Sequence, residues 1–181
     1  LTKLRSKKRD LYNEFWDQFG QVIKEGPGED FTNKEKVAKL LQFSTTKGES
    51  EFQREGLDEY IERMKDGQDK IYYLVADSLK GALNSPHLEI FKKKDIEVIL
   101  MHDRIDEWMM GHLNEYGGKQ FQDISRGQLD LGDLEDKEKK EDAEKTEKKY
   151  ESLIARIQSF LGDRVKEVRT TKRLTDSPAC L

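Results

Sequence analysis

The run Ile71-Tyr72-Tyr73-Leu74-Val75-Ala76 decides the fold of this chain. Continuous apolar and aromatic runs of this length are typical of strands that are buried on both faces of a sheet. A second run, from Ile96 to Met101, follows after a stretch with a helical pattern. The order strand, helix, strand predicts a parallel α/β unit. We therefore expect a small parallel-type sheet that is flanked by helices.

The segment after the second strand is the most distinctive in the chain, and it reads Asp103-Arg104-Ile105-Asp106-Glu107-Trp108-Met109-Met110. On a helical wheel its apolar side chains share one arc, with Trp108 at the edge of the arc and Met110 outside it, on the side of Asp106. Met110 is therefore expected to face solvent and to be available to a partner. The alternative is that the aromatic and methionine stripe belongs to the core.

Helices are also expected on both sides of this unit. Upstream, one amphipathic helix should end at Gly26-Pro27-Gly28 and bury a stripe of apolar residues spaced by three and four. Those residues are Leu11, Phe15, Phe19, Val22 and Ile23, and Tyr12 and Trp16 widen the same face. Downstream, Gln120 to Ser125 is typical of an edge strand, and Gly127 to Gly132 of a linker. A long helix should follow from Leu134 to Phe160, charged in its first half and apolar on one face in its second half.

Composition restricts the function further. Charged residues make up 39% of the 181 residues, but the net charge is only −4, with 33 basic and 37 acidic residues. This balance argues against a nucleic-acid partner, which normally requires a basic excess. The single cysteine, Cys180, excludes an intrachain disulfide framework and is typical of a reducing compartment. With no signal peptide or transmembrane run, we expect a cytoplasmic protein that does not bind membranes.

Candidate catalytic groups are few. His102-Asp103 resembles the dyad of a metal-dependent phosphohydrolase, but such a site needs further ligands. Only two other histidines, His87 and His112, are available. Asp103 also suits the N-cap of the following helix. Since Gly26-Pro27-Gly28 follows a helix, where a phosphate loop would follow a strand, no nucleotide loop is indicated. We expect no catalytic, cofactor or metal residues, with the phosphohydrolase as a minor alternative.

Several runs closely resemble the ninety-kilodalton heat-shock chaperone family, over nearly the whole chain and least in the charged segment. The most specific run is Asp103 to Met110 as quoted above. Further matching runs are Asp58-Glu59-Tyr60-Ile61, Lys70-Ile71-Tyr72-Tyr73, Ser85-Pro86-His87-Leu88-Glu89 and Arg173-Leu174-Thr175-Asp176-Ser177-Pro178-Ala179. The resemblance implies that residues 1–126 are the late part of the family's middle domain. Residues 127–181 would then open its carboxy-terminal dimerisation domain, as a partial α+β unit after the long charged helix.

The resemblance also implies a function, namely that of a stress-response chaperone for protein folding. The parent protein would be a homodimeric ATPase that uses ATP and Mg²⁺ at a site outside this chain. This piece would bind non-native client proteins and couple the ATPase cycle between domains of the same chaperone. The family's client-holding region maps onto Glu107 and Trp108, and the helical-wheel argument adds Met110. A purely structural inter-domain module, with clients bound elsewhere, is the alternative.

Overall fold

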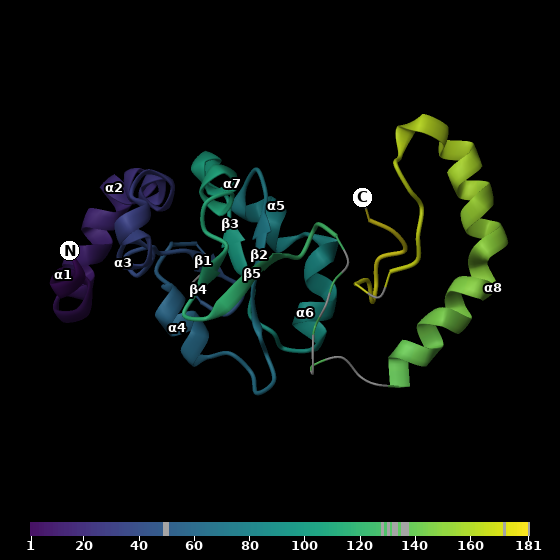
Figure 1. Ribbon diagram of the computed structural model, residues 1–181, viewed down its shortest axis with the longest axis horizontal. Coiled ribbons are helices and arrows are strands. Elements are labelled where there is room, and N and C mark those ends of the chain that lie inside the picture. Colours follow the sequence, from purple (N-terminus) through teal and green to yellow (C-terminus); the bar gives the residue numbers. More distant parts are fainter. Residues whose placement is uncertain are drawn as a thin grey trace.

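The computed structural model describes residues 1–181 except 49–50, 128, 130, 132–133, 135–137, 172 and 181, and within 138–149 it describes only the backbone. Figure 1 shows an elongated arrangement with a mixed sheet at its centre. Helices from the start of the chain lie at one end, and one long helix stands clear of the sheet at the other. The prediction of an α/β fold with a small, mostly parallel sheet flanked by helices is confirmed.

The sheet has five strands in the order β1-β3-β2-β5-β4. The strands are β1 (Ser44–Thr45), β2 (Lys70–Val75), β3 (Ile99–Met101), β4 (Glu115–Tyr116) and β5 (Lys119–Asp123). The central strand β2 pairs in parallel with β3, where Leu74 lies opposite Leu100, and in parallel with β5, where Ile71 lies opposite Phe121. Both outer strands are antiparallel to their neighbours.

The position of β5 corrects the expectation that Gln120 to Ser125 form an edge strand. That prediction is wrong, because β5 pairs with β2 on one side and with β4 on the other. The tight turn between β4 and β5 contains Gly117 and Gly118, with φ of 56° and 73°. Glycine adopts such positive φ values without steric strain. The turn folds β4 back onto β5 and so moves the edge of the sheet outward by one strand.

Alternate residues of β2 point into two separate cores. Ile71 lies in the core beneath the helices from the start of the chain, whereas Tyr72 and Leu74 lie in the core on the opposite face. The second core is covered by α5 (Leu79–Leu83), η2 (Pro86–Leu88) and α6 (Glu89–Lys93), which connect β2 to β3. This burial on both faces explains why the strand is continuously apolar.

Helices α1 (Thr2–Lys7), α2 (Arg9–Glu29), α3 (Lys34–Ala38) and α4 (Leu57–Glu62) contribute to the first core, and the 3-10 turn η1 (Phe31–Asn33) precedes α3. The expected inward face of α2 is correct for Tyr12, Phe15, Trp16 and Ile23, which are buried or packed against the core, but wrong for the other three residues. Leu11, Phe19 and Val22 are 48%, 52% and 63% exposed, whereas Tyr12 and Trp16 are buried. Their polar atoms decide the rotation of the helix, since the Tyr12 hydroxyl donates to the Leu40 carbonyl (2.5 Å) and Trp16 Nε1 donates to Gln53 (3.3 Å).

The expected end of α2 is also wrong, because the helix continues through Gly26-Pro27-Gly28 to Glu29. Pro27 has no N–H to donate to the Ile23 carbonyl, so the helix continues past it with one backbone hydrogen bond fewer. The N–H of Asp30 still donates to the Gly26 carbonyl at 2.9 Å and closes the helix. The additional turn brings Gly28 against the segment that the sequence marked as distinctive.

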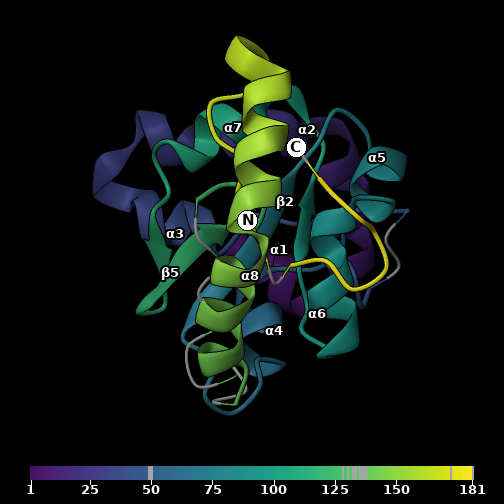
Figure 2. The same ribbon diagram turned by 90° about the vertical axis from the view of Figure 1, so that its right-hand side faces the viewer.

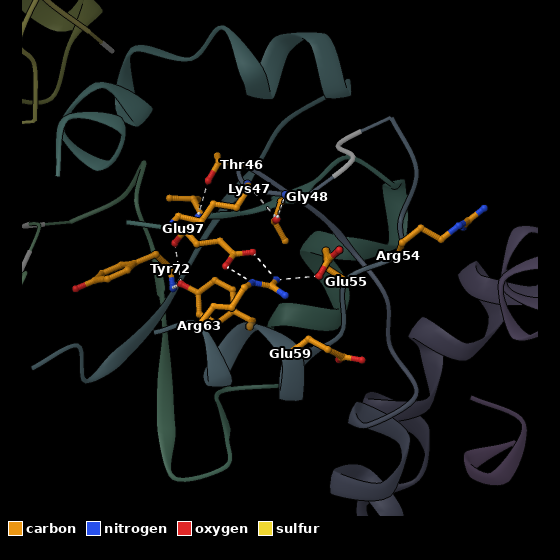
Figure 3. Close-up of polar contacts among 12 residues, drawn as sticks. Thr46, Lys47, Gly48, Arg54, Glu55, Glu59, Arg63, Tyr72 and Glu97 are labelled. Atoms are coloured by element: carbon orange, nitrogen blue, oxygen red, sulfur yellow. Dashed lines mark hydrogen bonds and ion pairs between the residues drawn. The ribbon is translucent and has the colours of Figure 1, made fainter. Parts of the chain in front are cut away.

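A buried polar cluster ties α4 to the approach of β3 (Figure 3). Glu97 is 4% exposed and receives two hydrogen bonds from Arg63, at 3.0 Å from Nε and 2.7 Å from Nη2. Arg63 also pairs with Glu55 at 2.8 Å. The hydroxyl of Tyr60 donates to the Glu97 carbonyl at 2.8 Å and accepts from the backbone N–H of Tyr72 at 3.1 Å. Burial raises the pKa of Tyr60 far above its usual value, so the hydroxyl keeps its proton.

The C-terminal part consists of α8 (Glu138–Leu161), η4 (Gly162–Arg164) and an extended segment that returns to the sheet unit. The expected apolar stripe of α8 is open to solvent, since Leu153 is 49% and Phe160 is 83% exposed. The domain boundary near Gly127 stays a prediction, and part of the expected linker from Gly127 to Gly132 lies outside the described residues.

Candidate functional site

The distinctive segment forms helix α7 (Arg104–Met110), which packs against α2. Its start is capped as predicted, with the backbone N–H of Asp103 donating to Asp106 Oδ2 at 2.9 Å. Lys24 of α2 reaches both aspartates, at 2.7 Å from each, although its side chain is only 1% exposed. Gln53 adds a hydrogen bond to Asp103 Oδ2 at 2.8 Å. One buried lysine thus fixes the start of α7 to α2.

The charges in this cluster compensate one another. Burial raises the pKa of Asp103, but the ion pair with Lys24 and the hydrogen bonds from Lys24 and Gln53 outweigh it, and the net pKa is below its usual value. An uncompensated charge at this depth would be strongly destabilising. The cluster therefore acts as a fixed joint between α2 and α7.

Trp108 lies at the other end of α7 and is 43% exposed. A Cβ atom placed on Gly28 would lie 2.3 Å from Trp108 Cη2, so the indole ring rests directly on this glycine. The ring also contacts His112, with the two ring centroids 4.6 Å apart. The ring centroid of His112 lies in turn 6.3 Å from that of Phe31. Phe31 is 69% exposed. The expected edge position of Trp108 is confirmed, and the ring belongs to an exposed aromatic row.

Glu107 is exposed and paired. Its Oε1 accepts from Arg126 Nη2 at 2.6 Å, and the side chains of Glu107 and Arg126 are 66% and 70% exposed. Arg126 also lies 3.4 Å from Asp123, a residue of β5. Hydrogen bonding to Glu107 raises the pKa of Arg126 above its usual value, and the charge of Asp123 adds to this. Exposed pairs of this kind contribute about 0–1 kcal/mol and break readily.

Met110 is not where the helical wheel placed it. Its side chain is 8% exposed and belongs to the first core, so the expectation that it faces solvent is wrong. The wheel assumed one apolar face, but α7 is covered on two sides, and Asp106 on the same side is also buried. Met110 still lines an open depression of about 540 Å³. The depression is bordered by Lys34, Tyr73, Leu113, Asn114, Glu115, Gln120 and Phe121.

Asp103, one half of the dyad considered for metal chemistry, is held by Lys24 and Gln53. No group of three or more His, Cys, Asp and Glu side chains suited to a metal ion occurs in the part of the chain that the structure describes. Within those same described residues, no helix is both long and apolar enough to cross a membrane.

Four residues of this region were not identified from the sequence. Gly28 was read only as a helix stop, Phe31 and Arg126 carried no pattern, and Lys24 resembled one of many surface charges. A signal for Lys24 existed, because it continues the four-residue spacing of Tyr12, Trp16 and Gly20 on the buried face of α2. Gly28 acquires its role only through Trp108, which lies 80 residues further along the chain.

Comparisons with known proteins identify relatives of this chain. The chain is 59% identical to the chaperone protein HtpG of Colwellia psychrerythraea and 58% identical to that of Pseudoalteromonas translucida, in each case over all of this chain and 28% of the relative. HtpG of Legionella pneumophila (strain Paris) is 55% identical, over all of this chain and 29% of the relative. The chain thus spans less than a third of the length of these curated relatives.

A solved structure, the middle domain of a heat shock protein from Plasmodium falciparum, is similar with a TM-score of 0.57 and 35% identity. It covers 62% of this chain, and the match covers 47% of that protein. The family described as Hsp90 protein matches residues 1–181. Sequence, fold and comparisons together therefore show that this chain belongs to the Hsp90 family.

Proposed function

We propose that this chain is a client-binding part of a molecular chaperone, and that α7 carries the contact surface. The observation that carries the proposal is the placement of Trp108, whose large apolar ring is 43% exposed on a rigidly anchored helix. Exposed apolar rings on a fixed support are typical of protein interaction sites. The proposed contact residues are Glu107, Trp108 and Met110, the last reached through the open depression beside it.

The same residues explain why the surface would accept varied partners. Trp108 offers apolar area, Met110 a polarizable thioether, and Glu107 a charge whose partner Arg126 is exposed and replaceable. Non-native proteins expose apolar segments with no fixed sequence, so a small anchor with adaptable neighbours suits them. The surface requires no bound cofactor. In the longer relatives, ATP and Mg²⁺ would bind outside residues 1–181, and the homodimeric parent would act in the cytoplasm.

Coupling between domains is the second part of the proposal. The stripe Leu11, Phe19 and Val22 on α2 and the stripe on α8 both expose apolar side chains. Such faces suit contacts with other domains of the same chaperone. This observation equally favours the rival function, a structural inter-domain module with clients bound elsewhere, so the two functions must be separated by experiment.

The test is the affinity of the 181-residue chain for a permanently unfolded probe, reduced and carboxymethylated α-lactalbumin. Trp108→Ser should weaken binding at least about fivefold, because the indole supplies much of the apolar contact. Leu11→Ser is the matched control, since Leu11 is 48% exposed and lies at the far end of α2, about 25 Å of helix away from Gly28. Equal affinities of Trp108→Ser and the parent chain, with unchanged circular dichroism, would favour the structural module.

A further inference from the structure

The extended segment after η4 is attached to the sheet unit at two points of opposite chemistry. The first is the guanidinium of Arg173, which is 7% exposed and donates to three successive backbone carbonyls. Nη1 donates to Ser125 at 3.3 Å, and Nη2 donates to Arg126 at 3.1 Å and to Gly127. Arg169 donates to the same Gly127 carbonyl at 3.1 Å. The guanidinium of Arg173, with Arg169 beside it, thus occupies a cradle of carbonyl oxygens that follows β5.

The second point has the opposite polarity. Glu89, the first residue of α6, accepts hydrogen bonds from three successive backbone N–H groups of the same segment. The N–H groups of Thr175 and Asp176 lie 2.6 and 2.9 Å from Oε2, and that of Ser177 lies 3.1 Å from Oε1. The Ser177 hydroxyl also donates to Oε1. Figure 2 shows the segment passing beside α6.

The carbonyl cradle is directly connected to α7. Arg126 is held through its backbone carbonyl by Arg173, and its side chain pairs with Glu107 at 2.6 Å. Asp123 supports the loop from the other side, because its Oδ1 accepts the N–H of Ser125 at 2.8 Å while its Oδ2 lies 3.4 Å from Arg126. A short path of polar contacts therefore runs from residue 173 to the residue next to Trp108.

We propose that Arg169 and residues 173–177 form a clasp that places Arg126 over Glu107, and so links the position of the α8 region to the client surface on α7. Arg173 and Arg126 are positioning residues in this scheme. The effect of the clasp on client binding rests on the proposed function, whereas the path of contacts from Arg173 to Glu107 does not.

The contacts of Arg173 with the carbonyl cradle and of Glu89 with residues 175–177 suit a clasp that can open and close. Arg173 bonds to neutral carbonyls of a loop in which Arg126 and Gly127 are exposed, so water can replace each partner when the segment leaves. Glu89 is half-buried, so water can reach its carboxylate as well. By contrast, breaking the Lys24 cluster would leave aspartates buried without compensation. The joint between α2 and α7 is therefore permanent, whereas the clasp is releasable.

The structural part is tested by hydrogen exchange of the full 181-residue chain. Arg173→Met keeps the aliphatic stem and removes the donors, so amide exchange in residues 123–127 should rise about tenfold or more. Exchange in residues 104–110 should rise about two- to fivefold, the range of one exposed ion pair, because α7 keeps its Lys24 contacts. Arg164→Met, at an exposed position in η4, is the matched control and should leave both unchanged. Faster exchange in 123–127 with no change in 104–110 would overturn the link to α7.

The functional part is tested by a double-mutant cycle on affinity for carboxymethylated α-lactalbumin. The effects of Glu107→Gln and Arg126→Gln on this affinity should be coupled by a factor of roughly two to five, the range of exposed ion pairs. This coupling should disappear when Arg173→Met is also present. Coupling that persists without Arg173 would refute the clasp as a positioning device. Where Arg173→Met reduces the folded fraction, Glu89→Ala opens the clasp from the α6 side and must give the same loss.

The two proposals fail separately. If Trp108→Ser binds the probe as well as the parent chain, the client surface is wrong, and the exchange experiment still decides whether the clasp reaches α7. If Trp108→Ser weakens binding but the cycle shows no dependence on Arg173, the client surface stands and the clasp is wrong.

Discussion

Replacing Gly28 by alanine tests the contact on which the Trp108 ring rests, called here the seat of Trp108, without removing any functional atom. The added Cβ would lie 2.3 Å from Trp108 Cη2, 2.9 Å from Cζ2 and 3.0 Å from His112 Cδ2. Carbon atoms pack at about 3.5–4.0 Å, so the indole must retreat by about 1.2 Å or more. The ring can do so only outward, because Gly28 blocks the inner side and the outer side is open to solvent.

The expected stability change is small because two effects oppose each other. Lifting the ring removes about half of its buried area, which costs about 1–2 kcal/mol. Alanine in place of a helical glycine returns about 0.5–1 kcal/mol. The net destabilisation should therefore lie between about 0 and 1.5 kcal/mol, or a decrease in Tm of at most about 3–6 °C for a chain of this size.

The assay is quenching of tryptophan fluorescence by iodide. Trp16 is 3% exposed and Trp108 is 43% exposed, so quenching reports mainly on Trp108 and should increase in Gly28→Ala. Gly81→Ala in α5 is the matched control, because its Cβ would meet only Ser78 Oγ, at 3.2 Å. Unchanged quenching in Gly28→Ala at unchanged circular dichroism would refute the proposed seat.

Four further outcomes are expected. Lys24→Met should destabilise the chain by about 3–5 kcal/mol, measured by urea denaturation, because it leaves buried carboxylates unpaired. Arg63→Met should act similarly but less strongly through Glu97, since Arg63 is partly exposed; a loss below about 0.5 kcal/mol would contradict this. Val22→Ser, at a site 63% exposed, should change stability by less than about 0.5 kcal/mol. Hydrogen bonds from Ser177 and its neighbours lower the pKa of Glu89 from 4.5 to about 2, so the clasp should be fully held above pH 4.5 and released as the pH falls toward 2. The Ser177 amide chemical shift would follow that release, and Glu89→Gln should abolish the pH step.

The sheet could be predicted from the sequence because its signal is local. The apolar run from Ile71 is explained by burial on both faces, and the start of α7 by Asp103 and Asp106 three residues apart. These features depend on residues that are close in the chain. Local patterns were therefore sufficient for the fold class and for the position of α7 in the chain.

The rotation of α2 and the burial of Met110 could not be predicted in the same way. Helix α2 carries two apolar stripes, and the choice between them depends on Leu40 and Gln53, which accept bonds from the buried ring systems. Met110 is buried because α7 is covered on a second side by elements remote in sequence. Pairing of Glu107 with Arg126 is likewise a tertiary contact with no local signature. Partners far apart in sequence decided each of these points.

The continuity of α2 through Pro27 has a mechanical consequence. Its 21 residues form a rod about 30 Å long, with an exposed apolar stripe toward one end and the seat of Trp108 at the other. A pivot of about 5° at the Arg9 end of such a rod displaces Gly28 by about 2.5 Å. Lys24 lies one turn before Gly28 and joins α2 to the start of α7, so α7 must follow this displacement. A small tilt imposed on the outer face of α2 would thus move α7 and Trp108 together, as one unit, relative to the sheet.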